Sequence, residues 1–319
     1  MRKAILLLLK AALSALLLYF ALNLVNVGTV ASRLGAIRFS WSALGLAVLF
    51  VQTVLLAVRW RLILDKCGAG LPVSAVLRFT MIANFFSQTL PSSVGGDAVR
   101  IWLAGRETNW RAATYSVLLD RVIGVVALAL VVTFCLPWSL VLVRDPVGRI
   151  ALVAAGLGCL VAGVVFIGLA SERLSILQRW TPTRHLAATA AIARDILLTP
   201  RSAFQLFGLS IPIHGLSGVV AWSAARAVGA DLTLLNALIL VLPVILISIV
   251  PISIAGWGVR ESAMVAAFGY AGLPQADGLI VSLLFGAGAL LLGIAGGFVW
   301  ILTTGRAERR AATHPSGLE

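Results

Sequence analysis

Two short stretches place a guanidinium just after a break that is rich in proline and glycine. The first reads PSSVGGDAVR from Pro91 to Arg100, and the second reads PISIAGWGVR from Pro251 to Arg260. Aligned at an offset of 160 residues, the two share the pattern P-x-S-x-x-G-x-x-V-R. Arginine is permanently charged and offers a planar fork of N–H donors that suits phosphate oxygens. The two stretches therefore predict an anion-binding site with one arginine from each.

Carboxylates beside both arginines leave two interpretations open. In one, Arg100 pairs with Asp97 and Arg260 pairs with Glu261, so that the charges only close the fold. In the other, the pairs open when a phosphate headgroup arrives. The predicted substrate-binding residues are Arg100, Arg260, Asp97, Glu261, Ser93, Ser253, Gly96 and Gly256; the predicted residues for ion or proton coupling are Asp97, Asp120, Arg121 and Glu261; the predicted turn residues are Pro91, Gly95, Pro251 and Gly258.

The composition is that of a membrane protein. Of the 319 residues, 60% are hydrophobic and only 12% are charged, and the mean hydropathy is +1.03. The net charge of +13 fits cytoplasmic loops and anionic headgroups, so no nucleic-acid partner is expected. Three cysteines and three histidines, widely spaced, predict neither a disulfide framework nor a metal site, and no cofactor is expected. His214 either shuttles protons or packs against a neighbouring helix.

Eight hydrophobic segments can be delimited, and they admit two topologies. Either all eight cross the membrane, or segments 73–111 and 233–272 are re-entrant hairpins between six full spans. With hairpins, 17 Lys and Arg residues fall inside and 5 outside, against about 13 and 11 for eight crossings. The hairpin topology is therefore predicted. The segments are 4–27, 41–64, 73–90, 112–143, 149–170, 202–228, 234–250 and 277–303.

The chain also matches itself beyond the two arginine stretches. Gly68-Ala69-Gly70-Leu71 corresponds to Gly229-Ala230-Asp231-Leu232 at an offset of 161. This predicts an all-α polytopic membrane protein built as one domain, 1–319, with repeats 41–143 and 201–303. Three full spans separate equivalent points, so the repeats would be inverted. The remaining parts would be a retained signal anchor (4–27), a linking span (149–170), a cytoplasmic amphipathic segment (171–201) that faces anionic lipid or only orients the chain, and a cytoplasmic tail (304–319).

The stretches NFFSQTLPSSVGGDAVR, ATYSVLLDRVIGVVAL and PISIAGWGVRESA together resemble the lysylphosphatidylglycerol synthase transmembrane-region family, also described as flippase-like membrane proteins. The resemblance covers about residues 44–302 and implies a lipid-handling membrane domain. The chain has Asp120-Arg121 where the family commonly has Glu-Arg. The namesake members carry a soluble aminoacyl-transferase domain, for which the tail GRAERRAATHPSGLE is too short, so synthase activity is not expected. The resemblance singles out Pro91, Gly96, Asp97, Arg100, Pro251, Gly256, Gly258, Arg260 and Glu261.

Three functions remain open at this point. The first is a flippase that moves an anionic or phosphate-bearing lipid across the cytoplasmic membrane, with both termini in the cytoplasm. The second is an integral membrane enzyme that modifies a lipid-linked substrate with Asp97, Asp120 or Glu261 as acid or base. The third is a non-transporting partner in envelope lipid assembly. No GxSxG, Walker or HExxH motif occurs, so we expect the protein not to be an enzyme; the lipid, the direction, the energy source and the oligomeric state stay open.

Overall fold

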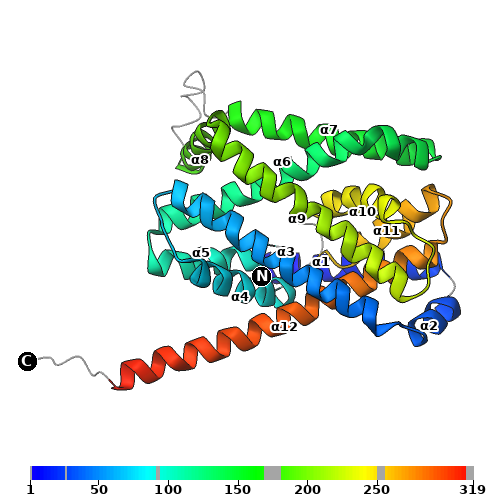
Figure 1. Cartoon of the computed structure of the whole chain (residues 1–319), viewed down its shortest axis with the longest axis horizontal. Helices are drawn as coiled ribbons and strands as arrows, with labels where there is room; N and C mark the ends of the chain where they lie inside the picture. Colours follow the sequence, from blue (N-terminus) through cyan, green and yellow to red (C-terminus); the bar gives the residue numbers. More distant parts are fainter. Residues whose placement is uncertain (1, 26, 91–93, 169–180, 250–255, 314–319) are drawn as a thin grey trace, which may run out of the picture.

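The computed structural model describes residues 2–25, 27–90, 94–168, 181–249 and 256–313, which fold into the helices α1 to α12 (Figure 1). The all-α prediction is therefore confirmed for these residues. The helices are α1 (Arg2–Asn23), α2 (Val27–Gly35), α3 (Phe39–Lys66), α4 (Val73–Thr89), α5 (Gly95–Glu107), α6 (Trp110–Leu142), α7 (Pro146–Gly168), α8 (Thr181–Leu198), α9 (Pro200–Ala227), α10 (Leu234–Ser248), α11 (Val259–Tyr270) and α12 (Gln275–Thr313).

Five helices among the described residues are long and apolar enough to cross a membrane: α3, α6, α7, α9 and the part of α12 up to Thr303. Each has 23 or more residues, and at 1.5 Å of rise per residue that spans a hydrocarbon core of about 30 Å. They coincide with five of the six predicted full spans, and the chain is a multi-pass membrane protein. The predicted anchor, 4–27, coincides with α1, which is followed by a short helix, α2, that the sequence did not predict.

The two predicted hairpin segments each form a pair of helices in contact. Segment 73–111 contains α4 and α5, and segment 233–272 contains α10 and α11. In Figure 1 the α4–α5 pair lies on the left and the α10–α11 pair on the right, with α3 and α9 running between the two sides. Residues 91–93 and 250–255, which include the predicted turn prolines and Ser93 and Ser253, lie outside the described residues.

Helix packing follows the same pattern in the two halves of the chain. Helix α3 packs on α4 as α9 packs on α10, and α5 packs on α6 as α11 packs on α12. Across the halves, α4 contacts α12 and α10 contacts α6. The turns after α3 and α9 are also alike: Gly68 and Gly229 have φ of 77° and 69°, and the next amide in each donates to a carbonyl five residues earlier. Positive φ at both positions explains why each turn has glycine.

The predicted amphipathic segment, 171–201, contains α8. This helix exposes Arg184 and Arg194 and buries Ala193 and Ile196 in a cluster with residues of α3, α6 and α9. The buried face of α8 thus packs on protein, and this contact fixes the helix against the start of α6 and α9. Residues 169–180 lie outside the described part of the chain.

Candidate functional site

A cavity of about 480 Å³ lies where the two halves of the chain meet, and we refer to it as the central cavity. Arg100 of α5 and Arg260 of α11 both line it, although 160 residues separate them. The structure thus brings together the two arginines that the sequence motifs single out. The other lining residues are Leu49, Gln52, Arg59, Ser87, Gln88, Asp97, Asp120, Arg121, Gly124, Val125, His214, Ser217, Ile245, Ser248, Ile249, Gly256 and Phe285.

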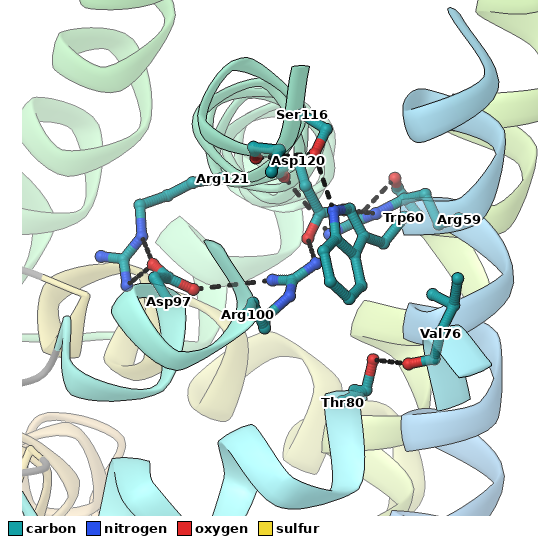
Figure 2. A network of polar contacts seen from close by, with 11 residues as sticks. Arg59, Trp60, Val76, Thr80, Asp97, Arg100, Ser116, Asp120 and Arg121 are labelled. Carbon is teal, nitrogen blue, oxygen red and sulfur yellow. Dashed lines mark hydrogen bonds and ion pairs between the residues drawn. The ribbon is translucent and has the colours of Figure 1, made fainter. Parts of the chain in front are cut away.

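One wall of the central cavity carries a chain of five alternating charges, which we call the charge network (Figure 2). Arg59 Nε lies 2.9 Å from one carboxylate oxygen of Asp120, and Arg100 Nη2 lies 2.8 Å from the other. Arg100 Nη1 then lies 3.5 Å from Asp97, whose other oxygen lies 2.6 Å from Arg121 Nη2. Three arginines face two aspartates, so the charge network has a net charge of +1.

Burial differs strongly along the charge network. The side chains of Arg59 and Asp120 are 4% and 5% exposed, whereas that of Arg121 is 36% exposed. Buried charges are tolerated only when paired and hydrogen-bonded, and Arg59 has a further acceptor in Ser210 Oγ at 3.0 Å. The Arg59–Asp120 end is therefore the structural anchor, and the Asp97–Arg121 end is the accessible part.

An aromatic ring holds Arg100 in place. Its guanidinium carbon lies 4.0 Å from the ring centroid of Trp60, which is fully buried. The indole is fixed in turn, because its Nε1 donates to Ser116 Oγ at 3.1 Å (Figure 2). A guanidinium stacked on an indole gains a cation–π contact while its edge donors stay directed at the aspartates. Trp60 is therefore part of the interior of the site.

Arg260 on the other wall has a simpler environment. Its Nη2 lies 2.8 Å from Glu261 Oε1, and its Nε donates to Ser282 Oγ at 3.0 Å. The guanidinium carbon lies 5.2 Å and 5.7 Å from the rings of Trp257 and Phe285. Arg260 is neutralised by a single carboxylate, so this wall adds no net charge to the cavity.

Glu261 caps helix α11 and does not line the central cavity. The side chain is fully buried, and its second carboxylate oxygen accepts a hydrogen bond from the Gly258 amide at 2.6 Å. Gly258 has φ of 86°, and a Cβ there would lie 2.6 Å from the Ser14 carbonyl oxygen of α1. Glycine is therefore required both by the backbone conformation and by the closeness of α1. Glu261 orients Arg260 and the start of α11 at once.

Some of the predicted glycines line the central cavity, and others pack between helices. Gly256 lines the central cavity, whereas Gly95 and Gly96 are buried at the start of α5 against α4. A Cβ on Gly96 would overlap Ser87 Oγ and lie 2.7 Å from the Ala83 carbonyl oxygen. Gly96 thus permits close packing within the α4–α5 pair. Both pairings considered from the sequence, Arg100 with Asp97 and Arg260 with Glu261, are present.

A comparison with protein families identifies the chain. The model of the lysylphosphatidylglycerol synthase TM region matches residues 7–297. The chain belongs to this family. The match includes both arginine stretches and the charge network, and membership is consistent with a lipid-related function in the membrane. No curated protein matches the chain.

Several residues that line the central cavity were not predicted from the sequence. The 17 Lys and Arg residues that the sequence placed inside include Arg59, but this residue is 3% exposed within α3. The predicted inside count therefore falls from 17 to 16 and still exceeds the 5 outside. Gln52 Nε2 donates to the Ile213 carbonyl and to Ser217 Oγ at 2.8 Å each, which joins α3 to α9 at the cavity. His214, for which the sequence left a proton shuttle or helix packing open, lines the cavity, and its Nε2 donates to the Gly124 carbonyl of α6 at 2.9 Å.

Proposed function

We propose that the protein moves an anionic, phosphate-bearing lipid between the leaflets of the cytoplasmic membrane, with the headgroup bound in the central cavity by Arg100 and Arg260. The observation that carries this proposal is that both arginines line one polar cavity inside an otherwise apolar helical body. A charged side chain at membrane depth costs roughly 3 kcal/mol on insertion scales. Four arginines around one cavity are therefore more than the fold alone needs.

The net charge of the wall favours an anion. The charge network carries +1, and Arg260 with Glu261 is neutral, so an empty cavity has one uncompensated positive charge. A phosphate group would displace Asp97 from Arg100 and Arg121, because the Asp97–Arg121 ion pair is the most exposed one in the charge network. Arg59 and Asp120 would stay in place and keep Arg100 oriented. Charge-assisted bidentate contacts of this kind are the stronger class of hydrogen bond.

The proposed inverted repeat offers a way for the central cavity to open to one side of the membrane and then to the other. In our proposal the α4–α5 and α10–α11 pairs are re-entrant hairpins that enter from opposite sides, and the two halves form an inverted repeat around the central cavity. The matching helix contacts of the two halves and the two arginine stretches support this arrangement. The excess of Lys and Arg in the assigned inside segments supports cytoplasmic termini.

We propose transport without a chemical step. A general base needs a carboxylate free to take a proton, yet Asp97 and Asp120 each lie between two arginines. Glu261 accepts hydrogen bonds from three residues, Gly258, Arg260 and Ser282. These contacts already occupy the carboxylate oxygens that a general base would direct at its substrate. Incubation with candidate lipids in detergent, where no second leaflet exists, tests this point, because a modified lipid would indicate an enzyme.

The deciding experiment is leaflet exchange in proteoliposomes. Fluorescent phosphatidylglycerol, phosphatidylcholine and a polyprenyl phosphate are compared for the native protein and for Arg100→Gln, Arg260→Gln and Arg121→Gln. The exposed Arg226 provides the matched control, Arg226→Gln, with the same change of charge. With the native and control proteins, we expect the two anionic lipids to exchange faster than phosphatidylcholine. In the three cavity variants, we expect this faster exchange to be lost. Unchanged exchange in variants that retain the native unfolding temperature would contradict the proposed role of the arginines.

A further inference from the structure

A second cavity, of about 360 Å³, lies apart from the central cavity where the start of α8 meets the start of α6. It is lined by Arg111 and Tyr115 of α6 and by Arg184, His185 and Ala188 of α8. None of these residues lines the central cavity. The transport proposal does not use the second cavity, and the two can be tested separately.

The charge of the second cavity is entirely positive. Arg111 and Arg184 are exposed, and neither forms a salt bridge with a described carboxylate. Arg78 of α4, by contrast, has the Glu107 carboxylate of α5 at 3.1 Å. Two guanidiniums that share one cavity without a carboxylate repel each other, and an anion between them would remove that repulsion.

Tyr115 and His185 supply a fixed neutral donor beside the two charges. The Tyr115 hydroxyl lies 2.7 Å from His185 Nδ1, and the tyrosine is only 8% exposed. In neutral histidine one ring nitrogen accepts and the other donates. In the tautomer whose Nδ1 accepts from the phenol, the ring N–H is on Nε2, at the edge of the ring that does not contact Tyr115. In that tautomer the contact between α6 and α8 holds a third donor next to Arg184.

We propose that the second cavity binds a phosphate-type oxyanion, with Arg111 and Arg184 as the charged ligands and His185 Nε2 as the neutral donor. The ligand is a lipid headgroup phosphate or a free phosphate compound, which share this chemistry. Trp110 and Leu186, the chain neighbours of Arg111 and His185, are 53% and 41% exposed and offer apolar surface to the acyl chains of a bound lipid. In this arrangement the bound anion joins α8 to the first turn of α6.

The test measures how fast the guanidinium of each of the two arginines is chemically modified. Phenylglyoxal modifies accessible guanidiniums, and peptide mass mapping follows Arg111 and Arg184 separately. Arg194, exposed further along α8 and not in the cavity, is the reference within the same sample. The native protein is compared in phosphatidylcholine nanodiscs alone, with added inorganic phosphate, and with phosphatidic acid in the disc.

A bound ligand slows modification by the factor 1 + c/Kd, where c is the ligand concentration and Kd is its dissociation constant. A ligand at a concentration of ten times Kd therefore gives roughly tenfold protection. We expect such protection at Arg111 and Arg184 and little change at Arg194. Protection by phosphatidic acid only identifies a lipid headgroup as the ligand, and equal protection by inorganic phosphate identifies a free anion; either supports the site.

The variant Arg184→Gln tests whether the two arginines act together. It should remove the protection of Arg111, whereas the matched variant Arg194→Gln should retain it. The proposal is overturned when neither phosphate source protects Arg111, when Arg194 is protected to the same degree, or when the protection of Arg111 survives in Arg184→Gln.

Discussion

Arg59 of α3 and Asp120 of α6 form an ion pair, with Nε 2.9 Å from Oδ1 and side chains 4% and 5% exposed. A Cβ on Gly124, one turn after Asp120, would lie 3.1 Å from Arg59 Nη2, so a glycine is needed for the arginine to approach α6. The pair leaves the second oxygen of Asp120 for Arg100. The position of Arg100 at the central cavity therefore depends on a contact buried behind it.

Asp120→Asn should lower the stability of the whole membrane domain. The variant leaves Arg59 buried without a carboxylate partner, and breaking a buried pair in this way costs about 3–5 kcal/mol. The matched control is Asp65→Asn, which removes a 4.0 Å contact to Arg61 between side chains that are both 39% exposed; surface pairs contribute about 0–1 kcal/mol. Thermal unfolding in detergent checks both, and equal unfolding temperatures would contradict the anchoring role of Asp120.

Gly286→Ala should disturb Arg260 without changing any charge. A Cβ on Gly286 of α12 would overlap Arg260 Nη2 and lie 2.9 Å from the Trp257 ring, so the guanidinium would have to move away from Glu261. We expect reduced lipid exchange in proteoliposomes. Gly215→Ala in α9, where a Cβ would meet nothing within 4 Å, is the control. Native exchange by Gly286→Ala would show that the position of Arg260 does not matter for transport.

Sequence patterns singled out residues of the central cavity where a motif recurs and missed them where no motif recurs. Arg100 and Arg260 were predicted because the same residue follows the same Pro/Gly pattern twice, and chance rarely repeats five identities at one offset. Arg59 was missed because an arginine near the end of an apolar run, beside Arg61, has the same local pattern as a cytoplasmic flank. Its burial depends on Asp120, 61 residues away, and no local pattern reports that distance.

The helices themselves were largely predictable, since apolar length determines which segments can cross a membrane. The roles of individual glycines were not. Gly96 and Gly256 occupy equivalent positions in the two stretches, yet Gly96 packs on α4 and Gly256 lines the central cavity. Glu261 could have been recognised as a cap, because it lies three residues after Gly258, which is the capping-box spacing.

Gly258→Ala and Gly256→Ala should differ although both glycines have positive φ, 86° and 80°. Alanine at either position destabilises the folded protein by about 1–2 kcal/mol, because the left-handed backbone conformation is unfavourable for a residue with a Cβ. Only Gly258 lies against α1, so its variant must also displace that helix, whereas a Cβ on Gly256 meets nothing within 4 Å. We expect a clearly larger fall in unfolding temperature for Gly258→Ala. Equal falls would show that the contact with α1 adds nothing to stability.

Asp97→Asn should strengthen headgroup binding and slow its release. The substitution removes the carboxylate that pairs with both Arg100 and Arg121, so the net charge of the charge network rises from +1 to +2 and a phosphate no longer competes with Asp97. Each favourable change of about 1.4 kcal/mol is a tenfold change in affinity. In proteoliposomes, exchange should saturate at a lower mole fraction of anionic lipid and reach a lower maximal rate, and added salt should restore part of the rate by screening the charges. Glu107→Gln, which removes the exposed partner of Arg78, is the matched control. A higher saturating mole fraction in Asp97→Asn would show that Asp97 helps to bind the lipid and does not compete with it.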